Sequence, residues 1–132
     1  MESLLGNTRK PDIAFYRDGH INITARIAKS LHIQEGDVVD IMKQDRELYL
    51  YVKMKSRDVV GQHTGRCRST TPRKGYRNFR TNCKRLCDAI FGICGDSNIV
   101  QLAAGECIDI PNVGLAVPLI TRINLYKDDK RD

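Results

Sequence analysis

Residues 19–41 (GHINITARIAKSLHIQEGDVVDI) limit the possible folds more than any other stretch of the chain. Ile21 and Ile23 alternate with polar neighbours, which is typical of a half-buried strand. Thr24 offers a hydroxyl that can cap the free N–H groups of a helix, and residues 25–31 place apolar side chains on one helical face. The stretch therefore predicts a strand followed by a short, capped helix.

Further strands are predicted on both sides of this helix. Before it, residues 13–17 alternate in polarity, and Asp18-Gly19 is a tight-turn dipeptide. After it, Gly36 can supply the positive φ of a turn. The remaining predicted elements here are a strand at 38–42, a hairpin connection at 44–46 and a strand at 48–52. A unit of about 40 residues is too small to close a core alone, so we expect it to pair with a similar unit.

The order of turn, strand, helix and hairpin follows the pattern of a known family. The matching positions are Gly19, residues 21–24, 26–30 and 31–33, Glu35-Gly36-Asp37, Val39, Ile41, Leu48 and Leu50. They comprise a turn glycine, a strand, a basic helix, an acidic-Gly-Asp turn and an apolar hairpin. Over residues 12–53 the chain thus resembles the AbrB/SpoVT family of swapped-hairpin DNA-binding domains, which includes MazE-type antitoxins.

The resemblance implies a swapped-hairpin fold that binds DNA through basic residues. Thr24 takes the place of the usual proline and can still cap the helix. His20 and Ala28 stand where the family commonly has DNA-contacting arginines. The cations that remain as candidate DNA contacts in this part of the chain are Arg17, Arg26 and Lys29.

The formal net charge of +6 has a local origin. No acidic residue occurs between Val59 and Cys87. The cations in this window are Arg66, Arg68, Arg73, Lys74, Arg77, Arg80, Lys84 and Arg85. Without these eight, 14 Lys and Arg face 16 acidic residues, so the rest of the chain is slightly acidic. The basicity therefore belongs to one segment.

The second half of the chain is predicted to begin with a loop or flexible arm at 65–78, which is rich in Arg, Ser, Thr, Pro and Gly. A helix is predicted over 79–93, with Leu86, Ala89, Ile90 and Ile93 on its apolar face and Gly92 or Gly95 at its end. Strands are then predicted at 98–102, 107–110 and 115–120, separated by turns at 103–106 and 111–114.

These elements favour a mainly β protein with short helices. The family resemblance implies that it is built as an AbrB-like swapped-hairpin or double-psi-like β-barrel. The expected division is an AbrB-like half at 12–55, a basic loop or arm at 56–78, and a divergent second half at 79–126 that completes the barrel. Two divergent halves in one chain would form an intrachain pseudo-dimer, as in MraZ-type tandem proteins. The alternative is a homodimer formed through residues 12–53.

Nucleic-acid binding is the function that the basic window favours. Its cations are spaced by small polar residues, so they could lie along a phosphate backbone and release counterions. Tyr76 and Phe79 lie among them and could stack on an exposed base. Together with the family resemblance, this predicts a DNA-binding transcriptional regulator or antitoxin-like factor, with DNA and a toxin or other protein as partners. The alternative is a non-enzymatic interaction or structural protein in which the window is a solvated loop.

The five cysteines are interpreted as free thiols, several of them buried as small hydrophobes. Cys83, Cys87 and Cys94 are close in sequence, but their spacing matches no common zinc pattern and no histidine is near. We therefore expect no metal and no cofactor. Glu35, Asp37 and Asp40 are expected to shape a turn rather than to hold a cation.

No enzyme motif is recognisable. The three histidines lie in separate segments, and the chain has no Gly-x-Ser-x-Gly, phosphate-loop or His-Glu-x-x-His motif. The apolar runs are shorter than the roughly 20 residues of a membrane-spanning helix, and the N-terminal residues do not resemble a signal peptide. These observations predict a non-enzymatic cytoplasmic protein.

Overall fold

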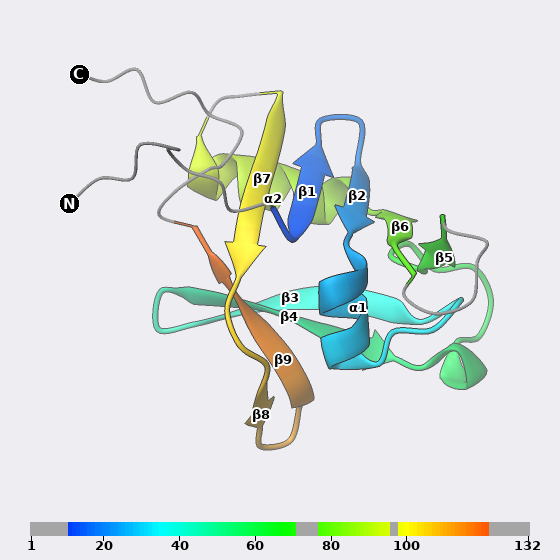
Figure 1. Cartoon of the computed structure of the whole chain (residues 1–132). Helices are drawn as coiled ribbons and strands as arrows, with labels where there is room; N and C mark the ends of the chain where they lie inside the picture. The colour runs from blue at the N-terminus through cyan, green and yellow to red at the C-terminus, as the bar shows by residue number, and fades with distance from the viewer. Residues whose placement is uncertain (1–10, 71–76, 96–97, 122–132) are drawn as a thin grey trace, which may run out of the picture.

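The computed structural model describes residues 11–70, 77–95 and 98–121 of the chain (Figure 1). These residues are mainly β: antiparallel strands form one curled sheet, accompanied by two α-helices and a short 3-10 helix. In chain order the elements are β1 (Ile13–Tyr16), β2 (His20–Ile23), α1 (Ala25–Leu31), β3 (Val38–Gln44), β4 (Glu47–Met54), η1 (Ser56–Asp58), β5 (Arg68–Ser69), β6 (Phe79–Asn82), α2 (Lys84–Cys94), β7 (Ile99–Ala104), β8 (Ile108–Ile110) and β9 (Gly114–Ile120).

The strand order interleaves the first part of the chain, which contains β1 to β4, with the second part, which contains β6 to β9. It runs β3-β4-β9-β7-β1-β2-β6-β5, and β8 pairs with β9. The β1–β2 hairpin and the β3–β4 hairpin therefore do not pair with each other, because β7 and β9 lie between them. Figure 1 shows this crossing, with β7 running from the β1–β2 hairpin towards β9. The first part of β7 pairs with β1, and Ala103 and Ala104 at its end pair with β9.

Three strand pairs, β1–β7, β2–β6 and β4–β9, join the two parts of the chain. In the β2–β6 pair, Ile21 lies opposite Thr81. In the β4–β9 pair, Leu50 lies opposite Val117. All four of these side chains are buried. The core is thus built from both parts of the chain, and removing either part would expose the apolar face of the other.

The segment just before β5 is hydrogen-bonded on both sides. The Cys67 N–H donates to the Asp37 carbonyl at 2.7 Å, and the Gly65 N–H donates to the Asn82 carbonyl at 2.9 Å. Cys67 is fully buried, and Arg68 and Ser69 pair with β6. The prediction of a loop or flexible arm is therefore wrong for residues 68–69, which form β5. Residues 65–67 belong to no named strand, although their backbone groups bond to neighbouring segments. Residues 71–76 of the predicted arm lie outside the described residues.

Helix α1 forms where it is predicted, but its cap is different. Thr24 makes no side-chain capping bond to the helix, and its hydroxyl donates to the Asp12 carbonyl at 3.0 Å. The Ala25 N–H instead donates to the side-chain oxygen of Asn78 at 2.8 Å. An acceptor from a distant segment thus satisfies one of the free N–H groups at the helix start.

The predicted helix at 79–93 begins too early. Residues 79–82 form β6, because Phe79 and Thr81 point into the core while Arg80 and Asn82 face outward. Helix α2 starts at Lys84 and ends at Cys94, and Gly95 follows with φ of +104°. The buried face of α2 consists of Cys87, Ile90 and Phe91. The predicted apolar face was therefore partly wrong: Ala89 is exposed and Ile93 retains 51% of its exposure.

The acidic turn after α1 has the role that the sequence predicts. Gly36 has φ of +88°, and the Asp37 carboxylate accepts the Gln34 N–H at 2.8 Å. Asp37 is fully buried, and it also accepts the Ser56 N–H at 2.8 Å and the Lys55 ammonium at 2.6 Å. Each of these bonds compensates part of the cost of burying the carboxylate.

Candidate nucleic-acid interface

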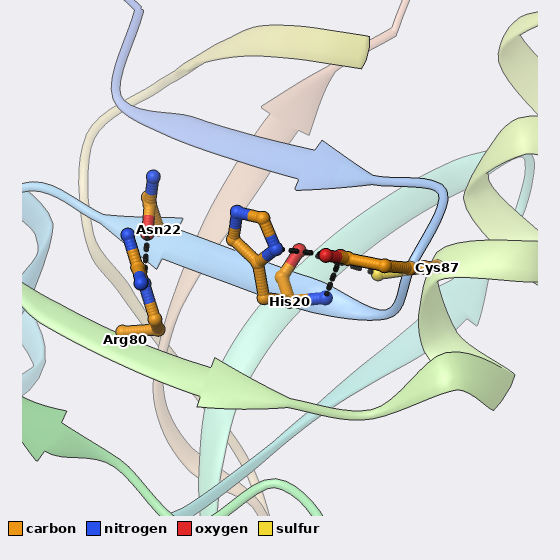
Figure 2. Close-up of polar contacts among 5 residues, drawn as sticks. His20, Asn22, Arg80 and Cys87 are labelled. Atoms are coloured by element: carbon orange, nitrogen blue, oxygen red, sulfur yellow. Dashed lines mark hydrogen bonds and ion pairs between the residues drawn. The ribbon is translucent and has the colours of Figure 1, made fainter. Parts of the chain in front are cut away.

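The outward side chains of β2 and β6 form a polar surface, here named the β2–β6 face, consisting of His20, Asn22, Arg80 and Asn82. Figure 2 shows the first three of these residues. They point outward because Ile21, Ile23, Phe79 and Thr81 occupy the alternating inward positions. His20 lies opposite Asn82, and Asn22 lies opposite Arg80. The face therefore carries two amide groups, a guanidinium and an imidazole, all of which can hydrogen-bond to nucleic acid.

Arg80 is oriented by its neighbours. Its Nε donates to the side-chain oxygen of Asn22 at 3.0 Å. Arg68 lies directly opposite Arg80 on the adjacent strand β5, and both side chains are exposed. Like charges in opposite positions on neighbouring strands repel each other. An anion placed between these two guanidinium groups would relieve that repulsion.

The other end of β2 carries an aromatic and acidic group. The rings of Tyr16 and His20 are stacked with their centroids 3.9 Å apart. The Asp18 carboxylate contacts the His20 ring Nδ1 at 2.5 Å and accepts the His20 N–H at 3.0 Å (Figure 2). That backbone hydrogen bond lowers the pKa of Asp18, and the His20 ring and Arg80 lower it further. The carboxylate therefore stays ionised, and holds the imidazole against Tyr16.

A pocket of about 350 Å³ lies between α1 and the beginning of β6. It is formed by α1, by the residues that follow α1, and by the chain entering β6. Its lining residues are Ala25, Ala28, Lys29, His32, Ile33, Gln34, Arg77 and Phe79. Two predicted nucleic-acid contacts, Lys29 and Arg77, are thus brought together from segments that are distant in sequence. None of the described lining residues is acidic.

Several other residues that were predicted to contact nucleic acid form ion pairs or a cation–π contact within the protein. Arg26 forms an ion pair at 3.0 Å with Asp12, which is buried. Lys84 pairs with Asp88 at 2.9 Å on the surface of α2. The guanidinium of Arg17 lies 4.1 Å from the centroid of the Phe91 ring, a cation–π contact. None of these three cations lines the pocket.

The remaining predicted contacts differ in exposure. Arg85 is exposed on α2, and Arg66 is half-buried next to β3, where it forms a bridge with Val38. Phe79, which was predicted to stack on a base at the surface, is buried, with 4% of its surface exposed, and it lines the pocket. The predicted contacts Arg73, Lys74 and Tyr76 lie outside the described residues.

Sequence reasoning missed four polar residues of this region: Asn22, Asn78, His32 and Gln34. Asn22 could have been predicted, because it points to the same outward side of β2 as His20. Asn78 gave no local signal, because the helix it caps begins 53 residues earlier. His32 and Gln34 line the pocket because His32, at φ of 55°, turns the chain after α1.

The described residues offer little for metal or thiol chemistry. No group of three or more potential metal ligands occurs among them. Burial raises the pKa of the Cys67 thiol to about 12 and that of Cys87 to about 11, so both remain protonated at neutral pH. Cys87 donates its S–H to the His20 carbonyl at 3.6 Å (Figure 2). The buried cysteines thus act as small apolar side chains.

Comparisons of the chain with protein-family models, with curated proteins and with solved structures found no match. Within the described part of the chain, no helix is long and apolar enough to span a membrane.

Proposed function

We propose that this protein binds nucleic acid, as a DNA-binding regulator or an antitoxin-like factor, through the β2–β6 face and the arginines beside it. The observation that carries the proposal is the opposed pair Arg68 and Arg80. Both are exposed, and among the described residues neither forms an ion pair with a carboxylate. Arg77, two residues before β6, is also exposed and forms no ion pair with a carboxylate among the described residues. Exposed guanidinium groups that form no ion pair among the described residues suit phosphate oxygens.

The interleaved topology supports a second element of the proposal, an AbrB-like pseudo-dimer within one chain. The order strand, helix, strand occurs twice, as β2-α1-β3 and as β6-α2-β7. If a two-fold axis through the Ile21–Thr81 pair relates the two units, His20 and Arg80 would occupy equivalent positions in them. One chain would therefore present both halves of a DNA-binding surface without a second copy.

A salt titration tests the proposal. The full chain is titrated into a fluorescent DNA duplex at several salt concentrations, and the slope of log K against log salt is measured. Each phosphate contact contributes about −0.9 to this slope. The double variant Arg68→Gln/Arg80→Gln is expected to bind more weakly and to reduce the slope by about 1.8.

The matched control removes two exposed cations elsewhere, as Lys43→Gln/Arg57→Gln. Both double variants have the same net charge, so a general charge effect would weaken them equally. The proposal fails if the wild-type chain does not bind duplex at low salt. It also fails if the two double variants lose affinity and slope to the same extent.

A protein partner is a second candidate, favoured by exposed apolar side chains on the β8–β9 hairpin. Ile108 retains 42% of its exposure, Leu115 39% and Ile120 37%. Ile108 lies opposite Ala116 and therefore shares one face of the hairpin with Ile120, whereas Leu115 lies on the other face. Exposed apolar side chains on one face are typical of interaction sites. This candidate predicts that Ile108→Ser/Ile120→Ser lowers the mass measured in solution if the partner is a second copy of the chain.

A further inference from the structure

We propose that the pocket between α1 and β6 binds a single nucleotide unit, with the base inside the pocket and its phosphate at the cationic rim. The inference rests on the proposed function, and it defines the substrate as nucleic acid with an unpaired base, or a free nucleotide of the same chemistry. The pocket is distinct from the β2–β6 face, which would contact phosphates and the edges of paired bases.

The size and floor of the pocket suit a base. An apolar cavity of about 150 Å³ is large enough to hold benzene, and this pocket measures about 350 Å³. Its floor consists of Ala28, Ile33 and Phe79, all buried. The small side chains of Ala25 and Ala28 leave the space open, because neither extends beyond Cβ. A flat aromatic ring would gain apolar contact on this floor.

The rim supplies the polar groups that a nucleotide needs. Lys29 and Arg77 provide cations for the phosphate, and the Gln34 amide can both donate and accept hydrogen bonds at a base edge. The negative end of α1 is already compensated: the N–H of Ile33 donates to the Ala28 carbonyl at 2.9 Å, and Lys55 Nζ donates to the His32 carbonyl at 3.0 Å. The helix end therefore does little to repel a bound phosphate.

The location connects the pocket to the rest of the proposed interface. Arg77 lies two positions before Phe79, and Phe79 begins the strand that carries Arg80. A strand whose phosphates follow Arg80 and Arg77 would pass the mouth of the pocket. Its base could then enter without leaving the backbone contacts, provided that the base is unpaired.

The experiment compares three fluorescent or competing probes with the full chain: a single-stranded adenine 12-mer, a DNA duplex, and adenosine monophosphate. The variant Ala28→Leu fills the pocket. Its matched control, Ala89→Leu, makes the same change at an exposed position of α2. We expect Ala28→Leu to bind the single strand about tenfold more weakly, roughly the loss of one base contact, with the duplex unaffected. We expect Ala89→Leu to bind as the wild type does.

A second variant, Arg77→Gln, keeps the proposal testable if Ala28→Leu does not fold, since Arg77 is exposed. It is expected to weaken binding of both the single strand and adenosine monophosphate. Displacement of the strand by adenosine monophosphate in the wild type, and its loss in the pocket variants, would support a nucleotide unit as the ligand. Binding of the mononucleotide without binding of the strand would identify a free nucleotide as the source.

The two proposals fail in different ways. If the wild type binds neither duplex nor single strand at low salt, the proposed function fails. If duplex binding is salt-sensitive but Ala28→Leu and Arg77→Gln bind the strand and the mononucleotide as the wild type does, the pocket proposal alone is overturned. Shifts of the Ala28 and Ile33 methyl resonances with adenosine monophosphate would place the ligand in the pocket.

Discussion

Two buried carboxylates, those of Asp37 and Asp12, hold together segments that lie next to the strand ends. Asp37, with no exposed surface, bonds to the chain on three sides through Gln34, Lys55 and Ser56. Asp12 has a similar role near β7, where its carboxylate accepts the Ala104 N–H at 2.7 Å. Both carboxylates are satisfied by charge-assisted bonds, so truncating either would leave buried donors without an acceptor.

The Cys67 thiol makes stability dependent on pH in the alkaline range. Its pKa is raised to about 12 in the folded protein, because burial disfavours the thiolate and Asp37 and Glu35 add negative charge nearby. In the unfolded chain the thiol ionises at lower pH. The raised pKa therefore contributes stability below the unfolded value, and this contribution is lost as pH rises towards 12. The free energy of unfolding should fall above about pH 9, by up to about 1.4 kcal/mol per pH unit for this thiol.

Urea denaturation at pH 7, 9 and 10 measures this effect. Cys67→Ala is expected to be less stable than the wild type at pH 7, because it leaves a small cavity. Its stability should decline less with pH than that of the wild type. Parallel declines in the two proteins would contradict the assignment.

At the scale of elements, long-range hydrogen bonds replace the local signals that the sequence suggests. The strand alternation around Ile21, the Gly36 turn and the hairpin near Asp45 could be predicted, because each depends on neighbouring residues. The cap of α1 and the beginning of β6 could not, because both depend on pairing between distant segments. Residues 79–82 have few apolar side chains, so only their pairing with β2 identifies them as a strand.

The candidate site follows the same rule. Charge composition alone identifies the basic window, since the stretch between Val59 and Cys87 has no acidic residue. Charge composition does not distinguish Arg68 and Arg80, which lie opposite each other on β5 and β6, from Lys84, which forms an ion pair with Asp88. Nor does it show that Lys29 and Arg77 line the same pocket, because that depends on how α1 packs against the chain entering β6.

The distant cap of α1 gives a prediction at this scale. Asn78→Ala is expected to lower the free energy of unfolding by about 1 kcal/mol, because the Ala25 N–H loses its acceptor. Asn78→Asp keeps an oxygen acceptor and adds a negative charge at the helix N-terminus, so it should be at least as stable as the wild type. Urea denaturation of the two variants checks this.

The control for the cap is Asn82→Ala, an exposed change on the same segment. It should alter the free energy of unfolding by no more than about 0.5 kcal/mol. Equal losses from Asn78→Ala and Asn82→Ala would show that the cap of α1 contributes nothing specific.

At the scale of the whole molecule, neither part of the chain has a complete sheet. In a fragment of residues 11–59, β1 would lose its partner β7, and β4 would lose β9. Ile13, Phe15 and Leu50, which are buried in the full chain, would be exposed. We therefore expect this fragment to be unfolded or to self-associate, as judged by its mass in solution and its circular dichroism. A monomeric fragment with cooperative unfolding would show that the first part is self-sufficient.

The pairing of β1 with β7 also has a consequence for how the protein is made. Ile13 pairs with Leu102, and β7 in turn pairs with β9, which ends at Ile120. During synthesis, the β1–β2 hairpin leaves the ribosome long before β7 has been made, so its apolar face stays exposed until then. The sheet therefore cannot be completed until β9 has emerged, and these pairings between distant residues should make folding slow.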